Sequence, residues 1–338
     1  MLRLEAASTC FFCCFILALP VAKPLTGQYA PLPAGSVDLS LSSDETRLSA
    51  DFAIRATARS DTLRFSLSSL RIAIQGRPEP YLSAKIQVGL FGVGGVSGDS
   101  SVTPFELTAA FVQAELPDST EWKRIFHPLI QFGQLPVPYA LEAITPTPLL
   151  QTYKRADATL RLAFRSDLGL LGQIAPFGSV IIVAGVFNGL RPNDSLSREA
   201  RGLAVGRVTV LPISSVAFSA NIAKDGSARF WGFDTRWVLG AYVIEGEWLG
   251  QLKRSPAPVH DEGGYALLSY RVTPHFQPVI RWEYLADQTG IGRSCATLTG
   301  VNLLSIHERV RVQSDYVFRR SERTKRRNEF VVQVVTIL

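Results

Sequence analysis

Arginine is the residue type with the clearest capacity for chemistry in this chain. The sequence holds 28 arginines against 7 lysines and has a formal net charge of +6. The planar guanidinium suits phosphate and carboxylate groups, which it can contact with two parallel hydrogen bonds. Most of these arginines stand singly at alternate positions of predicted strands, whereas nucleic-acid-binding proteins cluster their cations on a helix or loop. We therefore predict small anions rather than nucleic acid as partners.

Residues suited to catalysis or metal binding do not form a recognisable pattern. The four histidines show no H-E-x-x-H spacing, and no G-x-S-x-G elbow or Walker-type loop is present. Cys10, Cys13 and Cys14 lie at the start of the chain, so loss of that segment would leave Cys295 alone. The sequence thus predicts neither an enzyme nor a protein with a cofactor, metal or disulfide.

The first 22 residues resemble an export signal. Arg3 precedes an apolar run from Cys10 to Leu19, and small residues follow as far as Ala22. The run is too short to span a bilayer, which fits a cleaved signal peptide at 1–22. Residues 23–46 are rich in Pro, Gly, Ser and Leu, and we expect an irregular lead-in there.

From Arg47 to the end, the chain alternates between apolar and polar residues. In Arg229–Gly240, for example, Trp231, Phe233 and Trp237 alternate with Asp234 and Arg236. This period of two predicts strands with one apolar face. The candidate strands are 47–58, 62–75, 81–91, 104–115, 125–135, 158–165, 168–175, 179–187, 200–211, 213–222, 229–240, 241–251, 263–272, 275–286, 296–307, 309–318 and 328–338.

These strands predict an all-β fold, a closed antiparallel transmembrane β-barrel over residues 47–338. Bacterial barrels have an even number of strands, so we expect about 16, with one candidate belonging to a loop or a merged strand. The many long strands, the export signal and the aromatic residues near strand ends favour a membrane barrel. A soluble exported β-sandwich is the alternative, in which the same aromatics would fill a single core.

If the apolar faces point to lipid, a set of cations points into the lumen. A basic strip on the early strands would attract anions, because rings or strips of cations select anions in pores. Alternatively, these residues pair with Asp and Glu across strands and stabilise the wall. The pore-lining candidates are Arg55, Arg64, Arg71, Lys85, Arg161, Arg165, Arg271 and Arg281.

The segment 136–152 is the candidate constriction loop. It carries four prolines, which stiffen it and keep it out of a strand interior. Such a loop either folds into the pore or forms an external lid. Pro136, Pro138, Tyr139 and Glu142 are its candidate site residues. The basic segment Arg319–Arg327 is either a solvated loop or a contact for lipopolysaccharide phosphates.

Several stretches of the second half resemble the phosphate-selective porin O/P family. The resemblance covers residues 125–338, although the chain ends on Leu338 instead of the aromatic residue typical of such barrels. The stretches that carry it are Gln131–Glu142, Gly185–Gly189 (GVFNG), Glu245–Leu249, Gly263–Arg271, Phe276–Leu285 and Gly300–Leu304 followed by Val310–Gln313.

The resemblance implies an outer-membrane porin for the passive diffusion of small hydrophilic solutes. It also implies a homotrimer, surrounded by outer-membrane lipid and lipopolysaccharide. Anion preference, phosphate included, is the expectation from the name of the family and the early basic strip. The alternative is a structural or adhesive outer-membrane barrel with a plugged lumen.

Overall fold

The protein is described by a computed structural model. The structure describes residues 39–43, 46–59, 62–93, 105–116, 120–176, 178–189, 202–253, 258–288, 292–305, 309–322 and 327–337. The predicted signal peptide, most of the predicted lead-in and Leu338 lie outside these residues.

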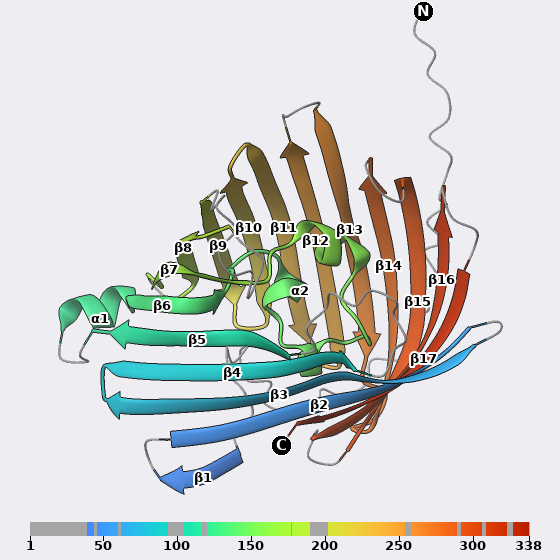
Figure 1. The fold of residues 1–338 in the computed structure, drawn as a ribbon, viewed down its shortest axis with the longest axis horizontal. Coiled ribbons are helices and arrows are strands. Elements are labelled where there is room, and N and C mark those ends of the chain that lie inside the picture. The colour runs from blue at the N-terminus through green and yellow to red at the C-terminus, as the bar shows by residue number, and fades with distance from the viewer. Residues whose placement is uncertain are drawn as a thin grey trace, which may run out of the picture.

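Strands make up most of the described chain (Figure 1). None of the helices in the described part is long and apolar enough to cross a membrane. The strands are β1 (Leu39–Ser43), β2 (Thr46–Ala58), β3 (Leu63–Glu79), β4 (Leu82–Val93), β5 (Phe105–Glu115), β6 (Leu129–Pro136), β7 (Ser166–Ile174), β8 (Val180–Phe187), β9 (Leu203–Ile213), β10 (Val216–Asp225), β11 (Ala228–Leu239), β12 (Tyr242–Lys253), β13 (Val259–Tyr270), β14 (Phe276–Asp287), β15 (Gly292–Leu304), β16 (Val310–Ser321) and β17 (Arg327–Ile337). The helices are α1 (Glu121–Phe126), α2 (Leu141–Ile144), α3 (Asp157–Leu162) and the 3₁₀ turn η1 (Thr147–Leu149).

The strands β2 to β17 form a closed antiparallel barrel of sixteen strands. Each pairs with its neighbour in sequence, and β17 pairs with β2 from Phe330 opposite Ala58 to Ile337 opposite Asp51. The short strand β1 pairs with the first residues of β2, beyond the point where β17 ends. Closure confirms the predicted barrel and excludes the sandwich alternative, because a closed sheet leaves no open edge.

Alternation along each strand separates the two faces of the barrel. In β10, Ser219, Asn221 and Ala223 are buried, whereas Phe218 and Ile222 are exposed. Exposed apolar side chains recur in this way on most strands, so the outer face is apolar and the inner face mostly polar. This is the opposite of a soluble protein and matches a barrel whose outer face meets lipid.

The two ends of the barrel differ in their connections. Two-residue turns such as Ser214–Ser215 and Gly240–Ala241 join strands at one end, which we call the turn end. The connection of β6 to β7 is long and leaves from the opposite end, which we call the loop end. Because neighbouring strands are antiparallel, the connection β2–β3 and the two-residue turn Gly226–Ser227 between β10 and β11 also lie at the loop end.

Sixteen of the seventeen predicted strands correspond to barrel strands, and one prediction is wrong. Residues 158–165, expected as a strand, are mostly helix α3. This segment lies inside the barrel with no neighbouring strand to pair with, and a helix satisfies its own backbone groups. Ala158 and Leu162, which lie four residues apart on the same side of α3, are both buried. The described strand β1 falls within the predicted irregular lead-in.

Gly133 in β6 is a position where the barrel backbone needs glycine. Its φ is 133°, and a Cβ there would collide with the carbonyl oxygen of Ala110 on β5. We expect Gly133→Ala to lower the free energy of unfolding by about 1–3 kcal/mol, measured by urea unfolding of the detergent-folded protein. Gly172→Ala is the control, since a Cβ there meets no atom within 4 Å. Equal losses in the two variants would contradict this close approach.

Candidate functional site

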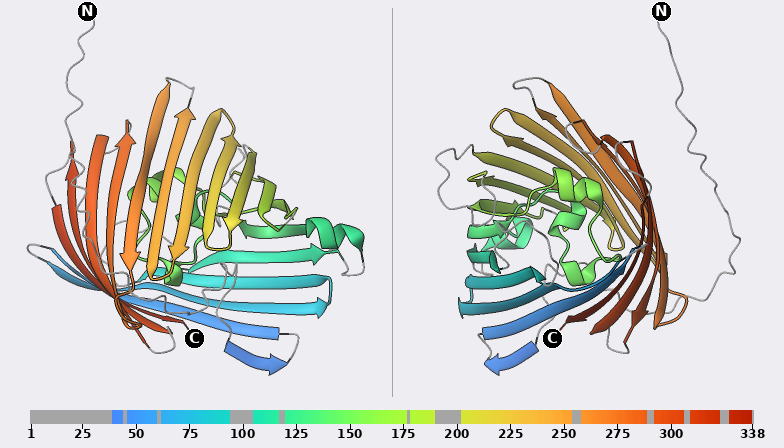
Figure 2. Two further views of the ribbon diagram at one scale, coloured as in Figure 1. Left: turned by 180° about the vertical axis from the view of Figure 1, so that it is seen from behind. Right: turned by 45° about the vertical axis from the view of Figure 1, so that its right-hand side comes forward.

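The connection between β6 and β7 folds into the barrel. Residues 137–165, which we call the inner loop, contain α2, η1 and α3. Figures 1 and 2 show α2 and α3 surrounded by the strands. Pro138, Tyr139 and Glu142, three of the predicted constriction residues, are buried in it, while Pro136 ends β6 and is exposed. The prediction left open whether this segment enters the barrel or covers it, and the structure places it inside.

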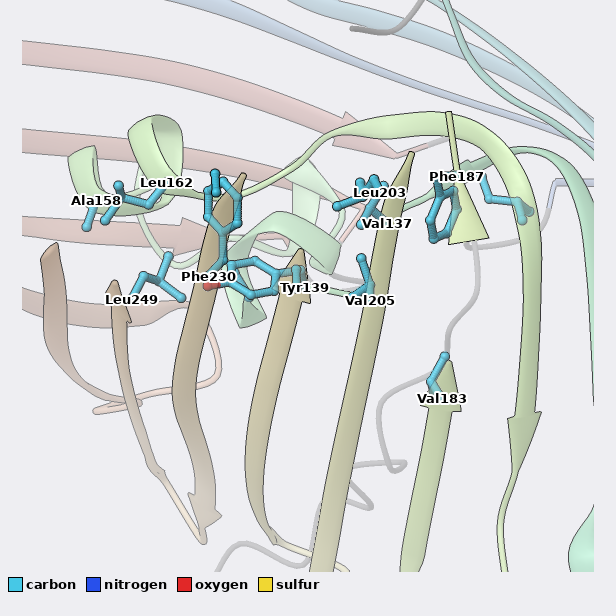
Figure 3. Packing of buried hydrophobic residues seen from close by; sticks show 14 of the residues in the cluster. Val137, Tyr139, Ala158, Leu162, Val183, Phe187, Leu203, Val205, Phe230 and Leu249 are labelled. Carbon is cyan, nitrogen blue, oxygen red and sulfur yellow. The ribbon is translucent and has the colours of Figure 1, made fainter. Parts of the chain in front are cut away.

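An apolar core holds the first part of the inner loop against β11 and β12. The Tyr139 hydroxyl donates to the carbonyl oxygen of Trp231 at 2.7 Å. Edge-to-face contacts join the Tyr139 ring to Phe164 at 5.2 Å and Phe164 to Phe230 at 4.8 Å. Figure 3 shows Tyr139 beside Phe230, with Leu162 of α3 and Leu249 of β12 nearby. This part of the lumen is therefore packed like the core of a soluble protein.

Arg281 of β14 is the polar centre of the contact between the inner loop and the wall. Its side chain is 0% exposed and lies 2.9 Å from Glu142 Oε1. The same guanidinium donates to Glu283 on its own strand, to the Thr152 hydroxyl and to the Lys154 carbonyl. One buried cation thus joins both the beginning and the middle of the inner loop to β14.

Glu142 occupies the matching position on the inner loop. Its carboxylate accepts hydrogen bonds from the Ala156 backbone and the Thr159 hydroxyl, and its own backbone N–H donates to Glu247 at 3.2 Å. Burial raises the pKa of Glu142 above its usual value, and the neighbouring Arg281 charge opposes that rise. The contacts make Glu142 an anchor of the loop rather than a group facing solutes.

A second set of contacts holds residues 150–153 to β16, β17 and β2. Arg311 and Gln313 both donate to the Leu150 carbonyl, at 2.8 and 3.0 Å. The Tyr153 backbone N–H donates to Asp315 at 2.9 Å. Arg55 donates to the Tyr153 carbonyl at 2.9 Å, and its guanidinium lies 5.0 Å from the centre of the Tyr153 ring. The inner loop is therefore attached at two separate regions of the wall.

The wall formed by β2 to β5 carries partly exposed charged side chains on its inward face. Its inward side chains Arg71 and Asp51 form an ion pair at 2.9 Å, and Lys85 interacts electrostatically with both. Arg165, at the end of the inner loop, interacts with Glu106 of β5. These side chains keep contact with solvent, unlike those beneath the inner loop.

Arg155 adds another cation to this group of charged side chains. It donates to the carbonyls of Glu142 and Thr145, at 2.7 and 2.8 Å. The pKa of Arg155 lies below its usual value, and burial is the largest cause. The charges of Arg71 and Arg165 lower this pKa further, whereas the charge of Glu142 raises it. The opening, defined as Asp51, Arg71, Lys85, Glu106, Arg155 and Arg165, therefore carries four positive and two negative charges.

A basic cavity of about 200 Å³ lies at the loop end, on β2, β3 and β17. Arg59 reaches Glu329 at 3.5 Å across it, and Arg64 has no hydrogen bond or ion pair among the residues that the structure describes. Its lining residues are Arg55, Thr57, Arg59, Thr62, Arg64, Ser66 and Glu329. A solute entering from the loop end would meet these cations before it reaches the opening.

The predicted pore-lining residues fall into separate groups. Arg71, Lys85 and Arg165 lie at the opening, and Arg55 and Arg64 line the cavity. Arg161 is on α3 instead of a strand and pairs with Asp287 at 3.1 Å. Arg271 follows β13 at the turn end, where its backbone N–H donates to Ala241. Arg281 lies beneath the inner loop, without access to solutes.

Sequence reasoning missed Arg155 and Arg59. Arg155 was missed because the predicted loop stopped at residue 152, while the inner loop continues to Arg165. Removing the wrong strand at 158–165 would have extended that loop and included Arg155. In the described part of the chain, no group of three or more His, Cys, Asp or Glu could hold a metal ion.

Comparisons with known proteins support the fold. No protein-family model and no curated protein sequence matches the chain. Solved structures of outer-membrane porins do match it, at sequence identities that show the fold alone. The anion-selective porin from Comamonas acidovorans is 10% identical, with a TM-score of 0.63 over 87% of this chain and 100% of that chain.

Two further structures extend this likeness. OmpF of Salmonella typhi, in complex with daunomycin, is 9% identical, with a TM-score of 0.64 over 87% of this chain and 97% of that chain. OmpT of Vibrio cholerae, an outer membrane protein in its trimer form, is 10% identical, with a TM-score of 0.61 over 87% and 99%. The chain therefore has the barrel fold of outer-membrane porins, whereas the resemblance to the phosphate-selective family rests on the motifs alone.

Arg281→Met should release the inner loop, because it leaves Glu142 and Glu283 buried without their cation. Breaking a buried pair in this way costs about 3–5 kcal/mol. We expect trypsin to cleave the variant at Lys154 or Arg155 while the barrel remains resistant, as read by mass spectrometry of the fragments. Arg161→Met is the control, since its ion pair is partly exposed. Resistance of Arg281→Met equal to that of wild type would show that the apolar core alone holds the loop.

Proposed function

We propose that this protein is an outer-membrane porin for the passive diffusion of small hydrophilic solutes, with a preference for anions, phosphate among them. The signal peptide at 1–22 would export it. The observation that carries the proposal is the charge of the opening, where four cations meet two acids between the inner loop and the wall. The porin fold and the apolar outer face support its place in a membrane.

The physical basis for anion preference is the confinement of charge. A surplus of positive charge in a narrow aqueous path, bounded by low-dielectric protein and lipid, raises the local concentration of anions. The cavity at Arg55, Arg59 and Arg64 extends this positive field to the loop end. Since guanidinium groups match oxygens arranged as in phosphate, the preference would include oxyanions as well as chloride.

A barrel with a plugged lumen is the second candidate. The inner loop and its apolar core fill the lumen beside β11 and β12, which favours this alternative. The partly exposed charged side chains on the inward face of β2 to β5 favour the pore. Lipopolysaccharide around the barrel and assembly into a homotrimer belong to the same proposal. They are supported by the family resemblance and, for the trimer, by the trimer form of the structurally similar OmpT.

Planar-bilayer recordings test the pore directly. We expect discrete conductance steps and, in a potassium chloride gradient, a reversal potential of the sign given by a chloride-selective path. Potassium phosphate gradients measure whether phosphate permeates as well. A reversal potential of the cation-selective sign would contradict the proposal. The absence of steps from a barrel that still shows heat-dependent gel mobility would favour the plugged lumen.

The double variant Lys85→Gln, Arg165→Gln should weaken the anion preference. It removes two cations of the opening whose side chains have no hydrogen bond to any residue that the structure describes. Arg71 and Arg155 then remain against Asp51 and Glu106. We expect the ratio of chloride to potassium permeability to fall about twofold or more, toward that of a neutral pore. Lys224→Gln, on the outer face of β10, removes a charge without touching the lumen and should leave this ratio unchanged. A double variant as selective as wild type would place the selectivity elsewhere.

A further inference from the structure

Two cations stand opposite each other on the outer face of the barrel at the loop end. Lys224, near the end of β10, is the direct cross-strand partner of Arg229, near the start of β11. The buried neighbours Ala223 and Phe230 point inward, so both cations point away from the lumen. Both side chains are exposed, and the hairpin between them turns at Gly226. We call Lys224 and Arg229 the outer cation pair.

The outer cation pair has no counterion in the described part of the chain. No hydrogen bond or ion pair there involves either side chain. The next outward positions in the same row are Ala204 on β9 and Leu252 on β12, which carry no charge. The nearest described acid on this face beyond β12 is Glu262 of β13, two strands away from Arg229. Its Oε2 atom lies 4.0 Å from His260 Nε2. Like charges placed directly opposite each other destabilise a strand pair, so an anion outside the chain would relieve the repulsion.

An apolar surface lies directly below the pair, toward the middle of the barrel. The next outward cross-strand pair is Ile222 and Trp231. The Trp231 ring lies so close to Gly250 on β12 that any side chain there would collide with it. Phe233 continues the same outward face along β11, and its side chain is exposed. The outer cation pair therefore stands at the boundary between an apolar, aromatic surface and the loop end.

This arrangement matches a lipid with a phosphorylated headgroup. Aromatic side chains mark the interface of a barrel with the polar part of the membrane, and long cationic side chains extend from there toward headgroup phosphates. Bacterial barrels have short periplasmic turns and longer extracellular loops, so the loop end faces the outer leaflet in the orientation that the proposed function requires. The lipid of that leaflet carries phosphates above several acyl chains.

We propose that Lys224 and Arg229 bind the phosphate groups of lipopolysaccharide, with the acyl chains lying against Ile222 and Trp231. The proposal rests on the outer-membrane location given above. It assigns the outer cation pair to lipid rather than to a free ion, because the apolar surface continues from the pair and offers acyl chains a place that inorganic phosphate does not use. Lipid phosphate would then neutralise the repulsion within the pair.

Binding is measured on the full-length barrel in detergent. Bisphosphorylated lipid A is added in increasing amounts, and the shift of the thermal unfolding midpoint is recorded, since a ligand that binds only the folded state raises it. We expect wild type to be stabilised. The double variant Lys224→Gln, Arg229→Gln should need roughly 30-fold more lipid for the same shift, because each cation near a charged surface contributes separately. The charge-preserving Lys224→Arg, Arg229→Lys variant should remain close to wild type.

Arg309→Gln is the matched control, since it removes an exposed cation at the turn end. It should respond to lipid A as wild type does. A double glutamine variant with unchanged affinity would overturn the proposal. So would equal stabilisation of wild type by chemically dephosphorylated lipid A, or by inorganic phosphate at the same concentration.

A second variant tests the repulsion itself. Lys224→Glu turns the like-charge pair into an opposite-charge pair across the hairpin. Without lipid it should raise the thermal midpoint above that of wild type, and it should lose the shift caused by lipid A. A lipid shift that survives in this variant would contradict the proposal.

The lipid test and the pore test fail independently. Chloride conductance from a barrel that lipid A does not stabilise would remove the lipid site and leave the porin. Stabilisation by lipid A of a barrel that does not conduct would remove the pore and leave the lipid site.

Discussion

Arg281 carries a positive charge at a position with no access to solvent, and that charge must be compensated within the protein. An unpaired charge in such a place would cost several kcal/mol, so partners are required. Glu283 comes from the same strand, but Glu142, Thr152 and the Lys154 carbonyl come from the inner loop. The requirement to pair the charge of Arg281 thus determines where both helix α2 and the middle of the inner loop lie. The shape of the remaining lumen follows from it.

The inner loop divides the interior of the barrel into two unlike regions. Beside β11 and β12, apolar side chains are buried and pack against one another. Beside β2 to β4, charged side chains remain accessible. Irregular backbone inside a barrel needs partners for its polar groups, and wall side chains such as Arg311 and Gln313 supply them. Close attachment on one side therefore leaves the other side as the candidate path for solutes.

Arginine occupies several distinct environments in this chain. Arg236 and Arg207 pair with Glu245 and Asp234 inside the wall, as the stabilising interpretation expects. Arg155 and Arg165 stand at the opening, where the proposed function gives their charges a role in attracting anions. Arg229 faces outward instead, above aromatic residues. The burial and the partners of each arginine therefore decide whether it stabilises the wall, contributes positive charge to the opening or lies on the outer surface.

The sequence alone determined the sixteen-strand barrel, because alternation with a period of two is a local property that each strand displays by itself. It also showed which face of each strand is apolar, and it singled out the proline-rich segment after β6. It did not show that Ala158–Leu162 is helical, because Leu160, Leu162 and Phe164 alternate just as they would in a strand. Only the tertiary structure decided that Arg281 is an anchor and Arg165 a residue of the opening. That decision depends on contacts such as the one between Glu142 and Arg281, residues 139 positions apart, which no local pattern encodes.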